Sequence, residues 1–220
     1  MRDGSSVLTE TPASNGDLPP SSAVVVAGAL YVVGTPIGNV DDFSPRARAI
    51  LGTVDRVCAE DTRTSGALLA RFGIHRPLQA VHDHNEDQAA AGLIKALQQG
   101  ASLALISDAG MPLVSDPGYA LVSAARAAEV PVYVVPGPSA VLAALAISGL
   151  PTDRFVFEGF LPSKRAARSR RLQALATETR TWVCFESAHR IAATAEDCAE
   201  VLPERRIFIA RELTKRFEES

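Results

Sequence analysis

Three short polar segments of this 220-residue chain carry carboxylate and imidazole side chains that could do acid-base chemistry. They are AEDTRTS at residues 59–65, HDHNE at 82–86 and SDAGMPLVSDPG at 107–118. A carboxylate or an imidazole can accept a proton, or orient a polar substrate, when it lies within hydrogen-bonding reach. The third segment is long, rich in Gly and Pro, and follows the apolar run ASLALI, which indicates a stiff loop after a buried strand.

Simpler roles compete with catalysis at two of these segments. In AEDTR, the charged residues Glu60, Asp61 and Arg63 could form only a local ion pair. Alternatively, Thr62 or Thr64 could cap a helix. In HDHNE, His82 and His84 alternate across a strand end and point in opposite directions. Hydrogen bonding is therefore favoured over metal binding there.

A basic run lies further along the chain. PSKRAARSRR has five Lys and Arg residues in its last eight positions and no acidic residue. Lys164, Arg168 and Arg171 are four and three residues apart, so a helix would place them on one face, with Arg165 beside it. Such a face favours contact with nucleic-acid phosphates, and a solvated helix surface is the common alternative.

The overall composition limits the class of protein. With 47% hydrophobic residues and a net charge of -3, the chain can bury one large core or two modest ones and is no polycation. Only 5% of its residues are aromatic, and Phe157 and Phe160 are the ones near the basic run that could stack on unpaired bases. Cys58, Cys184 and Cys198 lie apart in apolar runs, which predicts buried reduced thiols and no disulfide or zinc framework.

The N-terminal composition predicts a disordered leader over residues 1–28, because its first part is rich in Ser, Pro, Gly and Thr. The apolar segment SAVVVAGALYVVG is too short to cross a bilayer, and no secretion signal precedes it. We therefore expect a cytoplasmic protein without a membrane partner.

From residue 30 onward, β-branched runs alternate with amphipathic ones, which predicts parallel strands joined by crossover helices. The predicted strands are 30–34, 56–60, 78–82, 102–107 and 130–136, and the helices between them are 44–52, 64–72, 86–99, 117–128 and 138–148. After a linker at 149–153, the predicted strands are 155–160, 181–187 and 206–212, with helices 164–176 and 189–201. The sequence thus predicts an α/β fold with an N-terminal domain over 29–148 and a C-terminal domain over 154–220.

The segments after the first five strands are all polar and longer than a simple turn requires. In order they are GTPIGN, AEDTRTS, HDHNE, SDAGMPLVSDPG and PGPSA. The carboxyl ends of parallel strands share one edge of the sheet, where ligands of open α/β folds bind. GTPIGN matches neither G-x-G-x-x-G nor the P-loop pattern. In PGPSA, the N–H groups of Ser139 and Ala140 lie at a helix start and could bind a polar ligand group.

Eight motifs in order resemble one family. VGTPIGN, AEDTR, HDHNE, SDAGMPLVSDPG, PGPSA, EGFLP, FESAHR and ARELTK are similar to the ribosomal RNA small subunit methyltransferase I family, a branch of the tetrapyrrole methylase-like proteins. The resemblance covers residues 30–219. It implies two α/β domains of the tetrapyrrole methylase type, S-adenosylmethionine in the cleft between them, and a homodimer. Family members continue past ARELTK for several more strands, so the resemblance implies an incomplete C-terminal domain here.

The resemblance also implies an activity, which is 2'-O-methylation of a cytidine ribose in the decoding region of 16S small-subunit ribosomal RNA. The residues that match the family's cofactor pocket are Pro36, Ile37, Gly110, Met111, Val114, Ser139, Ala140, Glu186, Ser187 and Ala210. The candidates for the group that accepts the hydroxyl proton are Asp61, His84, Asp108, Asp116 and Lys164, and the sequence does not choose among them. The residues expected to contact RNA at the mouth of the cleft are Arg63, Lys164, Arg165, Arg168 and Arg171.

Two other functions stay open at this point. A small-molecule (tetrapyrrole) methyltransferase of the same fold would leave the basic run without a role. A non-catalytic RNA-binding ribosome assembly module would need the basic run, but it would not need five elaborated strand ends.

Overall fold

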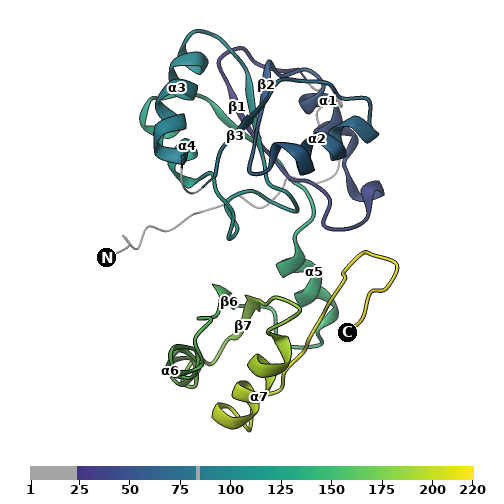
Figure 1. Ribbon diagram of the computed structural model, residues 1–220, viewed down its shortest axis with the longest axis vertical. Helices are drawn as coiled ribbons and strands as arrows, with labels where there is room; N and C mark the ends of the chain where they lie inside the picture. The colour runs from purple at the N-terminus through teal and green to yellow at the C-terminus, as the bar shows by residue number, and fades with distance from the viewer. Residues whose placement is uncertain (1–23, 83–84) are drawn as a thin grey trace.

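The computed structural model describes residues 24–82 and 85–220 and shows two α/β halves (Figure 1). The first half holds a five-stranded parallel sheet of order β3-β2-β4-β1-β5. Its strands are β1 (Leu30–Val33), β2 (Arg56–Ala59), β3 (Leu78–Ala80), β4 (Leu103–Ile106) and β5 (Val132–Val135). Its other elements are the 3-10 helix η1 (Val40–Asp42) and the α-helices α1 (Pro45–Leu51), α2 (Thr62–Arg71), α3 (Glu86–Gln98) and α4 (Tyr119–Ala127). All five strands predicted for this half are confirmed, with shorter ends.

Helices cover both faces of this sheet (Figure 1). Residues of α1 and α2 pack with Tyr31, Val33 and Ile106 on one face. Residues of α3 and α4 pack with Leu30 and Leu105 on the other. Neighbouring residues of one strand thus point into different cores, and both cores exclude water. This explains why the strands of this half appear in the sequence as continuous apolar runs.

Local signals fix the starts of several helices. Ser44 accepts a hydrogen bond from the Ala47 N–H at 3.0 Å and is followed by Pro45, the first residue of α1. Asp61 caps α2 in the same way, with a 2.8 Å bond from the Arg63 N–H. The cap predicted at Thr62 or Thr64 is therefore wrong, because Asp61 caps the helix and Thr62 is already its first residue.

The second half contains the parallel pair β6 (Phe155–Phe160) and β7 (Thr181–Phe185) with α6 (Arg165–Leu175) and α7 (Ile191–Val201). The third predicted strand, residues 206–212, is wrong. A strand needs a neighbour that completes its backbone hydrogen bonds, and in the described chain this segment pairs with neither β6 nor β7. Its one bridge joins Arg211 to Glu219, and Ile207 and Ile209 are exposed.

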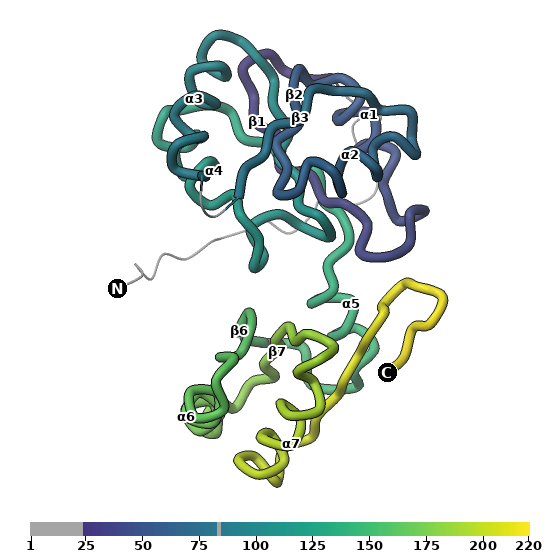
Figure 2. Tube along the Cα trace, viewed as in Figure 1, coloured from purple at the N-terminus to yellow at the C-terminus, as the bar shows by residue number. Residues whose placement is uncertain are grey.

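The segment after α7 returns to the first half. Figure 2 shows it running upward from α7 to the loops below the first sheet. There the Thr214 hydroxyl accepts a 3.1 Å hydrogen bond from the Asn39 N–H.

Helix α5 (Ala140–Ile147) follows β5 and contacts β7, so it lies between the two halves (Figure 1). Residues 148–154 form no helix or strand. The domain bounds at 148 and 154 stay a prediction.

The predicted leader lies outside the described residues up to residue 23. Residues 24–28 are held by hydrogen bonds, from the Val26 N–H to the Tyr31 hydroxyl at 2.9 Å and from the Gly28 N–H to the Gly100 carbonyl at 3.0 Å. The boundary of the leader at residue 28 stays a prediction. None of the helices in the described part is long and apolar enough to cross a membrane.

The three cysteines carry free thiols; Cys58 and Cys198 are buried and Cys184 is half-buried. Burial raises the pKa of Cys58 to about 12 and that of Cys184 to about 11.

Candidate functional site

The loops after β1 and β4 are joined by backbone hydrogen bonds. The Thr35 N–H donates to the Gly110 carbonyl at 2.9 Å, and the Gly110 N–H donates back at 3.2 Å. The Thr35 hydroxyl is fully buried and donates to the Ser107 carbonyl at 3.2 Å. The long loop over residues 107–118 is therefore anchored to the first loop at its start.

The long loop contains several residues in the left-handed region of backbone space. Leu113 and Ser115 have φ of 71° and 65°, and Gly110 and Gly118 have φ of 82° and 129°. Non-glycine residues adopt such angles only where the surroundings enforce them. A Cβ atom on Gly118 would lie 2.6 Å from the Leu105 side chain, so glycine is required there. The loop is thus held in one shape.

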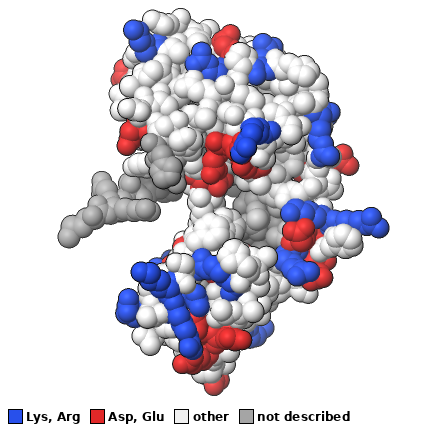
Figure 3. Space-filling view, viewed as in Figure 1, with Lys and Arg blue, Asp and Glu red and all other residues white. Residues whose placement is uncertain are grey.

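A pocket of about 240 Å³ lies between these loops and the ends of β6 and β7. Six of the ten residues predicted to hold the cofactor line it, namely Ile37, Gly110, Met111, Val114, Ser139 and Ala140. Its other lining residues are Ala109, Ser115, Asp116, Phe160 and Phe185. The pocket therefore contains residues of both halves, and Figure 3 shows the hollow between them.

The remaining four predicted cofactor residues, Pro36, Glu186, Ser187 and Ala210, do not line the pocket. The Glu186 carboxylate accepts hydrogen bonds from the Thr194 hydroxyl at 2.7 Å and from the Ser187 N–H at 2.8 Å, and it pairs with Arg190 at 3.2 Å. Burial raises the pKa of Glu186, but these donors outweigh that effect and hold it below its ordinary value. Because its carboxylate is occupied in this way, any cofactor contact at this position would come from the main chain.

The structure separates the candidates for the proton acceptor. Asp116 lines the pocket. Asp61 is paired with Arg63 at 3.0 Å, and the hydrogen bonds from Arg63 lower the pKa of Asp61. The Asp61 N–H donates to Asp108 at 3.4 Å, so these two acids lie together at the ends of β2 and β4. Lys164 is exposed at the start of α6.

His84 lies outside the described residues. The local ion pair that competed with a catalytic role for Asp61 is confirmed. Within the described chain, no group of three or more His, Cys, Asp or Glu side chains could hold a metal ion.

The basic run does not form the exposed three-charge face that its spacing predicts. Arg168 is 4% exposed, and its Nε lies 2.7 Å from Asp197 of α7. Arg171 pairs with Glu158 of β6, whose side chain is buried. Arg165 pairs with Asp197 at 2.9 Å and with Glu200 at 2.8 Å.

The prediction was wrong because the neutralising acids come from elements distant in the sequence. On the lower half of Figure 3, a band of basic side chains lies directly beside acidic ones. The sequence held one signal, since Asp197 and Glu200 are three residues apart and share a face of α7. Of the residues predicted to contact RNA, Arg63 and Lys164 are exposed without a partner from α7 or β6.

The sequence pattern singled out Phe160 as a residue that could stack on a base, but it placed neither Phe160 nor Phe185 in the wall of the pocket, where both lie. Both are the last residues of their strands. The rule that ligands lie beyond strand ends could have found them, had it been applied to the second half.

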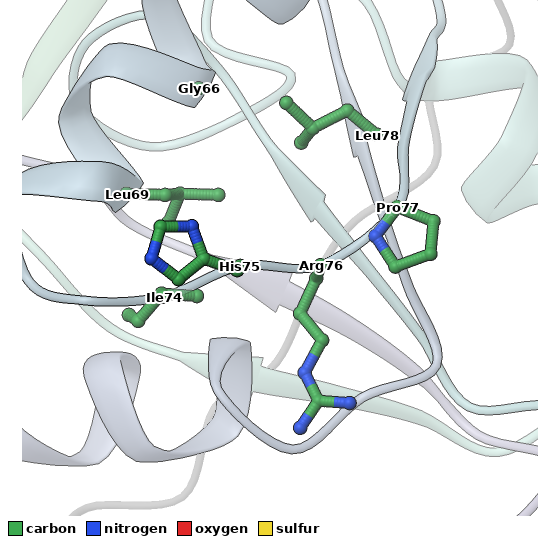
Figure 4. A pocket seen from close by; sticks show the side chains of 7 residues that line it. All are labelled: Gly66, Leu69, Ile74, His75, Arg76, Pro77 and Leu78. Carbon is green, nitrogen blue, oxygen red and sulfur yellow. The ribbon is translucent and has the colours of Figure 1, made fainter.

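A second hollow of about 280 Å³ lies beside α2 and the start of β3 (Figure 4). His75, Arg76 and Leu78 line it. Arg76 donates a 2.9 Å hydrogen bond to the Gly52 carbonyl at the end of α1. This hollow is at the amino end of a strand, which is the opposite edge from the loops of the candidate site.

The sequence profile of the Tetrapyrrole (Corrin/Porphyrin) Methylases matches residues 29–220. The chain belongs to this family. Three curated relatives, from Xylella fastidiosa, Pseudomonas aeruginosa and Synechocystis, are 58%, 53% and 50% identical and align with 87% of this chain. The alignments cover 70%, 68% and 69% of those proteins, each of which is named ribosomal RNA small subunit methyltransferase I. The resemblance identified from the eight motifs is thus confirmed.

Solved structures of tetrapyrrole methylases share the fold. A uroporphyrin-III-C-methyltransferase from Thermus thermophilus superposes with a TM-score of 0.55 at 24% identity, over 83% of this chain and 76% of that one. The native form of the uroporphyrin III C-methyl transferase from the same organism gives 0.57 at 20% identity, over 87% and 86%. These matches confirm the predicted α/β fold class.

Proposed function

We propose that this member of the tetrapyrrole methylase family transfers a methyl group from S-adenosylmethionine to small-subunit ribosomal RNA, at the ribose 2'-hydroxyl of a cytidine in the decoding region. The pocket between the strand-end loops and the ends of β6 and β7 carries the proposal, because it provides one hollow in which residues of both halves can contact a cofactor and a substrate group. The names of relatives at 50–58% identity support ribosomal RNA as the substrate class. From the family resemblance, we also propose that the protein works in the cytoplasm as a homodimer.

The residues of the pocket fit S-adenosylmethionine. Ile37, Met111 and Val114 provide apolar walls for its uncharged parts. Gly110 has no side chain to cover its backbone, and there is little room for one, since an added Cβ atom would lie 3.3 Å from Ile37. The start of α5 at Ala140 presents backbone N–H groups and the positive end of a helix dipole, which suits a carboxylate. When bound, this cofactor supplies a methyl group activated by a sulfonium.

The chain's own contribution is to align the ribose hydroxyl and to take its proton. A hydroxyl is a poor nucleophile, so holding it in line with the methyl group supplies much of the rate. We assign the proton to the carboxylate of Asp116, because this acid lines the pocket and neither Asp61 nor Asp108 does. Phe160 and Phe185 provide an aromatic wall on the side of the second half. Lys164 is an exposed cation available to RNA phosphates, and Arg63 is exposed as well while it pairs with Asp61.

The test is titration of the protein with S-adenosylmethionine by calorimetry, followed by methyl transfer to small ribosomal subunits that lack the modification. We expect binding, and transfer that leaves one cytidine resistant to alkaline cleavage of its 3' phosphodiester, since that cleavage needs a free 2'-hydroxyl. Transfer to a base would overturn the 2'-O assignment. Methylation of a tetrapyrrole in place of RNA would favour the small-molecule alternative, and RNA binding without cofactor affinity would favour the assembly module.

A further inference from the structure

Strand β6 is irregular just before its last residue. It pairs with β7 in register from Phe155 to Phe157, and the register then shifts before Phe160 pairs with Phe185. Gly159 lies in this shift with φ of 63°. A bulge of this kind bends the strand and re-aims the side chain that follows it.

The bulge also brings β6 against the long loop of the first half. A Cβ atom on Gly159 would lie 3.3 Å from the Ser115 hydroxyl oxygen. Ser115 and its neighbour Asp116 line the pocket together with Phe160. The side chain after the bulge therefore lines the same pocket as the assigned proton acceptor.

The two phenylalanines near the end of β6 have different environments. Phe157 is half-buried and packs edge-to-face on Phe185, with ring centroids 5.1 Å apart. Phe160 also contacts the Phe185 ring, at 5.6 Å, yet it is 56% exposed. The structure thus supports one side of the Phe160 ring and leaves much of the ring open at the pocket.

We propose that Phe160 is the platform on which the target nucleobase stacks, an inference that rests on the proposed function. For a ribose hydroxyl to enter a pocket between two protein halves, its nucleotide must leave the stack of its neighbours. An unstacked base regains stacking on an aromatic side chain, which is the usual way proteins hold single-stranded RNA. Phe185 already orients the Phe160 ring, so little side-chain entropy is lost on binding.

The test compares Phe160→Leu, Phe160→Tyr and the matched control Phe155→Leu. Phe155 is an exposed phenylalanine at the other end of the same strand, outside the pocket. For Phe160→Leu, we expect affinity for unmethylated small subunits to fall roughly fivefold or more, with S-adenosylmethionine affinity in calorimetry changed less than twofold. Phe160→Tyr keeps a stacking ring and should retain RNA affinity, as should Phe155→Leu.

Three results would overturn the inference. Unchanged RNA affinity in Phe160→Leu would show that the ring does not hold the base. An equal loss of cofactor affinity would place the ring against the cofactor. If Phe155→Leu weakened RNA binding as much, the effect would not be specific to the pocket. The unsubstituted protein is measured first. If it does not methylate RNA, both the proposed function and this inference fail. If it does, and Phe160→Leu also methylates RNA and binds it with unchanged affinity, only the inference is overturned.

Discussion

The backbones of Gly34 and Gly137 are in direct contact. A Cβ atom added to Gly34 would lie 2.7 Å from the Gly137 Cα atom, and one added to Gly137 would lie 2.8 Å from the Gly34 Cα atom. Gly34 follows β1, and Gly137 follows β5. The loops of these neighbouring strands therefore approach more closely than any side chain permits. The same Cβ atom on Gly34 would lie 2.7 Å from the Met111 sulfur, so this contact also involves the long loop.

Gly137→Ala should push the first and fifth loops apart. We expect S-adenosylmethionine affinity to fall tenfold or more, and the free energy of unfolding to fall by about 1–3 kcal/mol because of overpacking. Calorimetry and urea unfolding measure the two effects. The control is Gly92→Ala in α3, where an added Cβ atom has no neighbour within 4 Å. The control should leave cofactor affinity unchanged and stabilise the helix by about 0.5–1 kcal/mol.

Gly110→Leu should block the pocket. The first atom of the new side chain would lie 3.3 Å from Ile37 and 3.4 Å from the Pro138 carbonyl oxygen, and the rest would extend further. We expect S-adenosylmethionine binding to become undetectable in calorimetry. Gly100→Leu separates this effect from backbone strain, since Gly100 has φ of 97° and open space around it. Both variants should lose about 1–3 kcal/mol in the free energy of unfolding. If Gly110→Leu bound S-adenosylmethionine with the affinity of the parent, the assignment of the pocket would be refuted.

Arg168→Ala should affect stability more than RNA binding. It removes the closest cation of the buried Asp197 and leaves Arg165 as its remaining partner. The loss should therefore approach but not exceed the roughly 3–5 kcal/mol that a fully unpaired buried charge costs. Arg170→Ala is the matched change at an exposed position of the same helix, and it should leave the free energy of unfolding within about 0.5 kcal/mol of the parent value. Chemical denaturation distinguishes the two. Equal stability of both variants would show that the pair between α6 and α7 contributes nothing.

Stability should decrease in acid partly through Asp197. Burial raises the pKa of this carboxyl, but Arg165 and Arg168 outweigh burial and hold the pKa below its ordinary value of 3.8. A group whose pKa is lower in the folded state stabilises that state above its unfolded pKa, and this contribution is lost as the pH falls through the folded value. Asp197→Asn should therefore have a lower free energy of unfolding than the parent at pH 7, and this difference in free energy between the two proteins should become smaller below about pH 4.

The control for this pH dependence is Asp153→Asn, because Asp153 is exposed in the segment before β6. Its stability should follow the parent at every pH. A constant difference between Asp197→Asn and the parent from pH 7 to pH 3 would contradict the prediction. Glu186 also has a lowered pKa, so some acid sensitivity should persist in the Asp197 variant.

Asp116→Asn should lower kcat for methyl transfer by about a hundredfold or more, since loss of a general base typically costs 10²–10⁴ in rate. Cofactor affinity should stay within a few fold, because the amide has the size and shape of the carboxylate. Asp61→Asn should weaken the start of α2 and reduce kcat far less, because Asp61 is engaged with Arg63. Single-turnover kinetics on unmethylated small subunits measure both. Equal rates in the parent and in Asp116→Asn would remove Asp116 from the mechanism.

Much of the fold could be predicted from the sequence because its causes are local. The apolar runs of β1 and β4 and the Ser44-Pro45 helix start are short-range patterns, and each gave an element that the structure confirms. The prediction failed at residues 206–212. A β-branched run specifies a strand only when a partner strand lies beside it, and a sequence pattern does not show whether one does.

The sequence by itself determined the parallel order of α/β elements, the family, and which loops lie at the carboxyl edge of the sheet, because periodicity and strand direction follow from the covalent chain. Only the tertiary structure decided which side chains meet across that edge. It buried Arg168 against Asp197, placed Asp116 at the pocket, and left Phe160 open where Phe157 is packed. Charge pairing and exposure depend on contacts between residues far apart in the chain, and these exist only once the two halves have folded.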